Sequence, residues 1–272
     1  MTSRVLCKAD NLLEQAAASR AVIGLDTGAS PASLAIVVNG RVVGEECYRT
    51  ALHGAAIARA IDDLLAIAGI SIDELDAIAV GIGPGSFTGL RIGASYAKGI
   101  AFGTGCGIVG VPSLDAIAVG VLDDPRAHPG RTICPILDAR KGEVYTALYR
   151  IGSDGLEKLS RDLLMPLARL ISEIGPDAIL AGDRKSNEAA ALLRHKGIEV
   201  IAAEDRILET RGRFVAALGA ARFARGESDP IDAFEPLYVR PPEAEATRAA
   251  KASTAKTEDL WSAERKNSFG SI

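Results

Sequence analysis

The stretch Gly83-Pro84-Gly85-Ser86-Phe87-Thr88-Gly89-Leu90-Arg91-Ile92-Gly93 joins an apolar strand to a helix built from small residues. Residues 77–82, just before it, form a short apolar run rich in β-branched side chains, which is typical of a strand buried on both faces. Pro84 fixes its own backbone, glycines allow angles closed to other residues, and Ser86 or Thr88 can cap the following helix. A helix N-terminus attracts anions, so one interpretation of this motif loop is an anion-binding site. The other is that its glycines only form a tight turn between strand and helix. Its candidate residues are Gly83, Gly85, Ser86, Thr88 and Arg91.

The helix after this loop carries Gly89, Gly93 and Ala97 four residues apart. Glycine in a helix interior costs up to about 1 kcal/mol relative to alanine. The spacing therefore predicts a packing partner that needs the space. That partner is either the helix's own domain or another protein.

Composition predicts a soluble globular protein of two small domains or one large one. The chain has 272 residues, of which 48% are hydrophobic and 24% charged, with a net charge of -4. No apolar run is long enough to span a bilayer, and charged residues interrupt the first twenty residues, so we expect a cytoplasmic protein without a membrane partner. Mild acidity argues against binding nucleic acid alone. The four cysteines form no Cys-x-x-Cys pair and are expected to be reduced and partly buried: Cys7, Cys47, Cys106 and Cys134.

The order of predicted elements repeats. Strands at 21–25, 33–38 and 41–43, a helix at 55–68, the strand at 77–82 and the small-residue helix give β-β-β-α-β-α. A weaker copy has strands at 133–137, 143–149 and 156–160, a helix at 166–174, a strand at 178–181, a helix at 187–195 and a strand at 198–201. Two such halves predict an α/β protein with the duplicated fold of actin and sugar kinases, which is ribonuclease H-like.

This order also predicts the domain boundaries. Residues 1–20 are an N-terminal extension, 21–122 the first domain, 123–242 the second domain and 243–272 a disordered tail without apolar periodicity. The helix at 212–224 is expected to pack back against the body.

Four segments carry a family resemblance: Gly24-Leu25-Asp26-Thr27, the run 79–93, Asp138-Ala139-Arg140-Lys141-Gly142-Glu143-Val144-Tyr145 and Pro236-Leu237-Tyr238-Val239-Arg240. Over residues 21–242 the chain resembles the TsaB family, once called YeaZ. The resemblance implies a non-catalytic subunit that binds and activates TsaD. That enzyme forms N6-threonylcarbamoyladenosine beside the anticodon of tRNAs that read codons beginning with A.

The resemblance also implies the partners. TsaD and the small ATPase TsaE are expected to bind, two copies pair when TsaD is absent, and tRNA is met only through the complex. The implied docking face lies on the helices at 55–68 and 89–101. Its predicted residues are Ile57, Ile61, Leu64, Gly89, Gly93 and Ala97.

In this fold a turn after the first strand holds phosphate, and a carboxylate there reaches magnesium through water. Asp26, Thr27 and Gly28 stand at that turn and are interpreted as a vestigial nucleotide site, with a turn cap as the alternative for Asp26. The second phosphate loop, at 138–142, offers one glycine and two cations where several glycines are expected. We therefore expect no required cofactor, only weak binding of ATP or ADP, and no catalytic residue.

Metal binding and other activities find little support in the residues. The histidines at 53, 128 and 195 are isolated from each other, so no metal site is predicted. A glycoprotease-like peptidase would need a base beside a serine such as Ser86, and no histidine is near it in sequence. A small-molecule kinase of the same fold would use Asp26 as its metal carboxylate. Both remain alternatives to the subunit interpretation.

Overall fold

The computed structural model describes residues 5–6, 9–15, 19, 21–48, 54–203 and 206–239. The predictions for Cys7, His53 and the tail at 243–272 lie outside these residues. Within the described ranges, no helix has the length and apolarity that crossing a bilayer requires.

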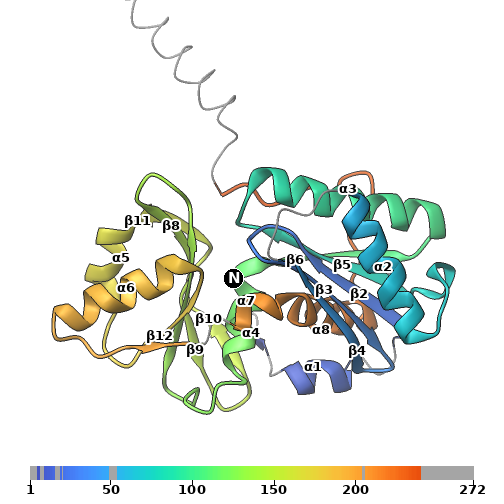
Figure 1. Ribbon diagram of the computed structural model, residues 1–272. Helices are drawn as coiled ribbons and strands as arrows, with labels where there is room; N and C mark the ends of the chain where they lie inside the picture. The colour runs from blue at the N-terminus through green and yellow to red at the C-terminus, as the bar shows by residue number, and fades with distance from the viewer. Residues whose placement is uncertain are drawn as a thin grey trace, which may run out of the picture. The chain divides into compact units, whose positions relative to one another are not determined.

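The first half contains a five-stranded sheet (Figure 1). Its strands are β2 (Ala21–Asp26), β3 (Ala32–Val38), β4 (Arg41–Tyr48), β5 (Ala77–Gly83) and β6 (Gly107–Pro112), in the order β4-β3-β2-β5-β6. The β2, β3 and β4 strands pair antiparallel, while β5 lies parallel to β2 and β6. The run predicted to be buried on both faces, in β5, is almost entirely buried, and so is the apolar run of β2.

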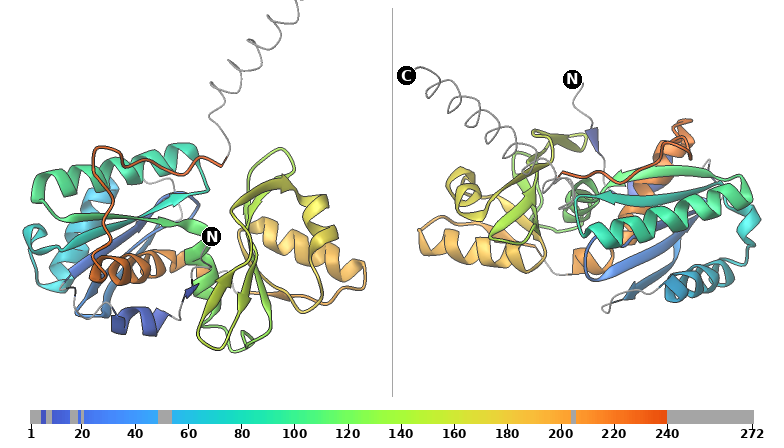
Figure 2. Two further views of the ribbon diagram at one scale, coloured as in Figure 1. Left: turned by 180° about the vertical axis from the view of Figure 1, so that it is seen from behind. Right: turned by 90° about the horizontal axis from the view of Figure 1, so that it is seen from above.

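Helices cover both faces of this sheet (Figure 1 and Figure 2). On one face, α2 (Gly54–Ala68) and α3 (Phe87–Thr104) share a hydrophobic core with Ile23 and Leu25 of β2. On the other face, α8 (Arg211–Ala224) contacts β2, β3, β5 and β6. Successive residues of a strand point to opposite faces, so Gly24 lies against α8. The helix predicted to pack back against the body is α8, and it covers the second face of the first sheet.

The second half repeats the plan with an eight-stranded sheet. Its strands are β7 (Thr132–Asp138), β8 (Glu143–Thr146), β9 (Tyr149–Ile151), β10 (Leu156–Lys158), β11 (Leu163–Pro166), β12 (Ile179–Gly182), β13 (Ile201–Ala202) and β1 (Val5–Leu6). The main order is β1-β10-β9-β7-β12-β13, and β8 pairs with β7 and β11. The order β10-β9-β7-β12-β13 corresponds to β4-β3-β2-β5-β6, which confirms the predicted duplicated fold. Helices α5 (Leu167–Glu173) and α6 (Arg184–His195) supply residues of its core.

Several elements of the second half differ from the sequence prediction. The strand predicted at 143–149 is interrupted at Ala147 and Leu148, so that β8 and β9 are separate partners of β7. The last strand is confined to Ile201–Ala202, and β11 was not predicted. Such short strands leave too few residues for an alternating pattern to stand out.

The segment predicted as an N-terminal extension takes part in the fold. The β1 strand pairs antiparallel with β10 of the second sheet, and α1 (Ala9–Gln15) contacts α8. Leu12 and Leu13 are buried. The domain boundary at residue 20 stays a prediction, but described parts of 1–20 contribute to both halves.

A buried polar cluster attaches α4 (Ser113–Val121) to the second sheet. The Tyr149 hydroxyl donates to Asp115 Oδ1 at 2.6 Å, and Lys158 Nζ lies 2.6 Å from both Asp115 Oδ1 and Asp162 Oδ1. Burial raises the pKa of Tyr149 well above its ordinary value. Burial alone would lower the pKa of Lys158, but the two carboxylates offset it and raise that pKa. The cluster thus keeps an ammonium charged between two carboxylates.

The cysteines differ in exposure, and this gives a first prediction. Cys47 is exposed, whereas Cys106 and Cys134 are buried. Burial raises the pKa of the Cys134 thiol to about 12, and it also raises the pKa of Cys106. Because the thiolate is the reactive form, we expect iodoacetamide to modify Cys47 in the folded protein and to reach the other two only in denaturant. Mass spectrometry of a Cys7→Ser variant measures this, and fast alkylation of native Cys134 would contradict its burial.

Candidate functional site

The motif loop at 83–89 lies directly against the turn after β2. Of the two caps predicted for α3, Ser86 is the one observed, since its Oγ accepts a hydrogen bond from the Gly89 N–H at 3.3 Å. The Ser86 N–H donates to the Gly28 carbonyl at 2.6 Å, and the Thr27 hydroxyl donates to the Gly89 carbonyl at 2.7 Å. Thr27 and Gly89 are 62 residues apart in the sequence, so two distant segments form one closed double loop.

The small residues of the motif are explained by this close approach. A Cβ on Gly85 would overlap the backbone of Gly28, and one on Gly89 would overlap the Thr27 carbonyl oxygen. A Cβ on Gly93 would lie 2.5 Å from Thr27 Oγ1 and 3.3 Å from Val80 Cγ2. Of the two partners left open by the sequence, the helix's own domain is the one that uses these positions.

The docking face predicted from the sequence is corrected here. Ile57, Ile61, Leu64 and Ala97 are buried in the core between α2, α3 and the first sheet. Gly89 and Gly93 face the turn after β2. Periodicity identified the apolar face of each helix correctly, but that face packs against the sheet. These six residues do not form an exposed surface.

A different stripe of α3 is exposed, and we call it the outer stripe. It consists of Ser95, Gly99, Phe102 and Gly103. Phe102 is 84% exposed, and a Cβ on Gly99 or Gly103 would meet nothing within 4 Å. On the neighbouring helix α2, Ile67 is 58% exposed.

The turn after β2 holds Asp26, Thr27 and Gly28, the predicted nucleotide-site residues. Asp26 is fully buried. Its Oδ2 lies 2.7 Å from Nε of Arg211, which is also fully buried, and accepts from the Ser113 hydroxyl at 3.0 Å. Its Oδ1 accepts from the Gly28 N–H at 2.8 Å and from Arg211 Nη2 at 3.2 Å. Arg211, which the sequence did not single out, thus completes this site.

The second predicted phosphate loop, at 138–142, is the turn between β7 and β8. Arg140 and Lys141 both adopt positive φ angles, of 63° and 52°. The Arg140 N–H donates to Asp138 Oδ1 at 2.8 Å, and the Asp138 N–H donates to Asp183 Oδ2 at 2.7 Å. Burial raises the pKa of the Asp183 carboxyl, although backbone N–H groups that donate to it act in the opposite direction. Carboxylates here take N–H groups that a phosphate loop would offer to its ligand.

The described part of the chain brings together no three potential metal ligands of the His, Cys, Asp or Glu type. His128 Nε2 accepts from Arg131 Nε at 2.6 Å, and His195 ends α6. Among the hydrogen bonds of the described residues, none joins a histidine to Ser86.

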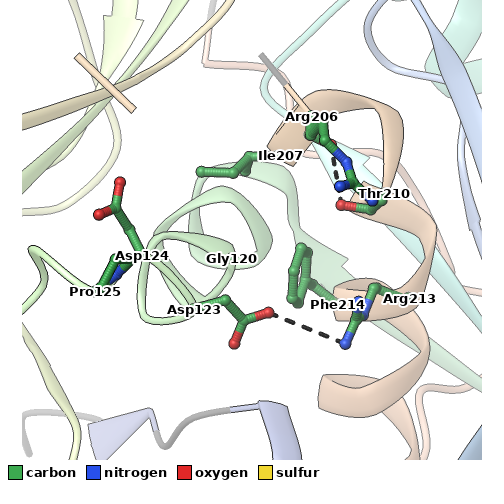
Figure 3. A pocket seen from close by; sticks show the side chains of 9 residues that line it. All are labelled: Gly120, Asp123, Asp124, Pro125, Arg206, Ile207, Thr210, Arg213 and Phe214. Atoms are coloured by element: carbon green, nitrogen blue, oxygen red, sulfur yellow. Dashed lines mark hydrogen bonds and ion pairs between the residues drawn. The ribbon is translucent and has the colours of Figure 1, made fainter. Parts of the chain in front are cut away.

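A separate pocket of about 240 Å³ lies where the end of α4, α7 (Arg206–Glu209) and the start of α8 meet (Figure 3). Arg213 Nη2 is 4.0 Å from Asp123 Oδ2 in its wall, and the Thr210 hydroxyl donates to the Arg206 carbonyl at 3.0 Å. This volume is below the roughly 300–1,000 Å³ of typical ligand sites. Asp123 faces Arg213 across the pocket, whereas Asp124 pairs with Arg126 at 2.6 Å. The lining residues are Gly120, Asp123, Asp124, Pro125, Arg206, Ile207, Thr210, Arg213 and Phe214.

Known proteins resemble this chain in sequence and structure. A family model described as TsaD, tRNA N6-adenosine threonylcarbamoyltransferase, matches residues 40–200. The "tRNA threonylcarbamoyladenosine biosynthesis protein TsaB" of Escherichia coli (strain K12) is 28% identical over 231 residues, 80% of this chain and 94% of that protein. The protein of the same name from Haemophilus influenzae is 36% identical over 126 residues, 46% of this chain and 51% of its own length. The solved structure of "YeaZ from Pseudomonas aeruginosa" matches with a TM-score of 0.67 at 25% identity, covering 80% of this chain and 99% of that one.

The repeated strand order and the loop after β2 define an α/β protein of the duplicated actin-like class. Within this class, the motif at 83–93 and the matches to named relatives identify the family. The chain belongs to the TsaB family, also known as YeaZ.

Proposed function

We propose that this chain takes part in tRNA threonylcarbamoyladenosine biosynthesis as a partner subunit without its own catalysis. In this proposal it binds and activates a TsaD-type transferase that forms N6-threonylcarbamoyladenosine in tRNAs reading codons that begin with A. Membership of the TsaB family supports the pathway. The proposed docking role rests on the outer stripe of α3.

No atom of the described structure lies close enough to Gly99 or Gly103 of the outer stripe to require a glycine there. Gly99 lies in the interior of α3, where a glycine costs about 1 kcal/mol relative to alanine, and Gly103 lies in its last turn. A Cβ at either position would meet open space. A partner helix that approaches the backbone closely would use that space. Phe102 lies between them and supplies a large apolar contact of the kind that anchors interfaces.

The remaining partners follow from the same proposal. TsaE would bind the assembled heterodimer of this chain and TsaD. A second copy of this chain would occupy the outer stripe when TsaD is absent. Binding of tRNA would occur only in the complex. Because tRNA is modified where tRNA is used, we keep the predicted cytoplasmic location.

Substitutions in the outer stripe are expected to weaken TsaD binding without destabilising the fold. Gly99→Leu fills the space left for a partner, and Phe102→Glu places a charge there, so each should weaken binding to TsaD about tenfold or more. The thermal unfolding midpoint of the isolated chain should stay within a few degrees of the original, because neither position contacts the core. Isothermal titration calorimetry against TsaD from the same organism measures the affinity.

The matched control is Leu192→Glu, which adds the same charge to an exposed apolar position on α6. It should leave TsaD binding unchanged. Unaltered binding by both outer-stripe variants would exclude α3 as the docking helix.

The peptidase and kinase alternatives have weaker support. One solved structure from Pseudomonas aeruginosa, 25% identical to this chain, is titled as similar to "peptidase YEAZ". However, the Ser86 hydroxyl serves as a helix cap, and Asp26 is bonded to Arg211. Hydrolysis of peptides or ATP by the purified chain alone would favour these alternatives.

A further inference from the structure

The actin-like fold places magnesium and a nucleotide phosphate at the turn after its first strand, and the residues of this chain do not fit that group. A carboxylate that reaches a hydrated cation needs a solvent-facing oxygen with a free lone pair. Asp26 is fully buried. The negative charge of its carboxylate therefore needs a counter-charge within the protein.

We propose that the guanidinium of Arg211 permanently takes the place of the metal cation at this site. Arg211 approaches the carboxylate with two nitrogens, Nε at 2.7 Å from Oδ2 and Nη2 at 3.2 Å from Oδ1. Such a two-point pair is the strong and directional form of the arginine–carboxylate interaction. A buried carboxylate requires a compensating charge, and Arg211 supplies it from within the chain.

The hydrogen bonds of Asp26 leave no position for a water or a metal ion. A carboxylate offers about four lone-pair sites. Arg211 and Gly28 donate to Oδ1, while Arg211 and Ser113 donate to Oδ2, so each oxygen already has two donors. A Cβ on Gly81 would lie only 2.6 Å from Asp26 Cγ and Oδ2, which shows how closely the strand behind the carboxylate is packed.

The phosphate side of the site is closed as well. A phosphate loop offers free backbone N–H groups to its ligand. Here the Gly28 N–H bonds to Asp26, and the Gly28 carbonyl accepts from Ser86 of the motif loop. The motif loop therefore packs directly against Gly28 of the turn, while Arg211 takes the place of the cation at Asp26.

This arrangement has a structural purpose that does not depend on the proposed function. Arg211 begins α8 and stands 185 residues from Asp26 in the sequence. Its Nη2 also donates to the Pro31 carbonyl at 3.3 Å. The former ligand site thus becomes the anchor of α8 on the first sheet.

The first experiment uses the unaltered chain with Mn²⁺ and ATP, followed by backbone NMR. Mn²⁺ broadens amide signals close to it. We expect no selective broadening at Thr27, Gly28 or Ser113 in either the absence or the presence of ATP. Selective broadening there would overturn the proposal, whether or not the chain binds TsaD.

A second experiment tests the guanidinium directly. Arg211→Ala removes it, and free guanidinium ion at concentrations well below denaturing ones should enter the cavity and restore several degrees of the lost unfolding midpoint. The control is Arg222→Ala on the same helix, which loses bonds to Glu227 and Gly110 outside this site and should not be restored. A folded Arg211→Ala variant without restoration, or equal restoration of both variants, would refute the assignment. If Arg211→Ala does not fold, the NMR result on the unaltered chain decides.

Discussion

Replacement of Gly24 by valine is expected to destabilise the first half of this protein strongly. Gly24 lies in the middle of β2, and a Cβ there would overlap the Ala216 nitrogen and the Gly212 carbonyl oxygen of α8. Both are backbone atoms, so rotation of a side chain cannot relieve the overlap. The helix would have to shift away from the sheet, and we expect a loss of about 3 kcal/mol in the free energy of unfolding, at the upper end of the usual cost of overpacking. Urea unfolding followed by circular dichroism measures it.

The control for this variant is the same change at Gly99. That position lies in the outer stripe, where a Cβ meets nothing, and valine has a somewhat better helix propensity than glycine. Gly99→Val should therefore unfold at the same urea concentration as the original chain, or slightly above it. If Gly24→Val also retained the original midpoint, α8 would not lie on this face of β2.

Sequence patterns predicted the layers well because burial leaves a local signature. The apolar runs of β2 and β5 identified strands, that of β5 as covered on both faces, and the motif after β5 predicted a turn with a cap at Ser86 or Thr88, of which Ser86 is the one observed. The repeated order of elements then led to the duplicated fold. All of these signals lie within a few residues of the element that they describe.

Side chains predicted for the docking face are buried in the chain's own core, because periodicity shows that a helix has an apolar face but not what covers it. Ile57, Ile61 and Leu64 have the spacing of an interface and the same spacing as a core. The glycines of α3 are equally ambiguous in sequence. Only the space around each position separates Gly93, which touches Thr27, from Gly99, which touches nothing.

The ion pair of Asp26 could not be predicted for a different reason. Its two residues are 185 positions apart, and an arginine in the first turn of a helix is usually solvated. The sequence therefore offered a vestigial nucleotide site or a turn cap for Asp26. Its bond to the Gly28 N–H agrees with a cap, and the bonds to Arg211 and Ser113 were not foreseen.

The Asp26→Ala variant is expected to be among the most destabilised single variants of this chain. Removal of the carboxylate leaves the Arg211 guanidinium buried without its counter-charge, which typically costs about 3–5 kcal/mol. Loss of tRNA modification by Asp26→Ala in a reconstituted reaction would then report on folding, and would not show that the site binds a nucleotide. Chemical unfolding of the variant must accompany any activity measurement.

A double-mutant cycle distinguishes the ion pair from simple loss of packing. Arg211→Met replaces the guanidinium by an apolar side chain, and in the Asp26→Ala background it removes the uncompensated charge. We expect the double variant to regain most of the stability lost in Asp26→Ala, because an apolar replacement of a buried ion pair is often neutral or stabilising. The coupling free energy should then be at least about 2 kcal/mol, within the upper range for groups in direct contact. Additive losses would mean that the two charges do not depend on each other, and that α8 is held to the sheet by its apolar packing and its close glycine contacts.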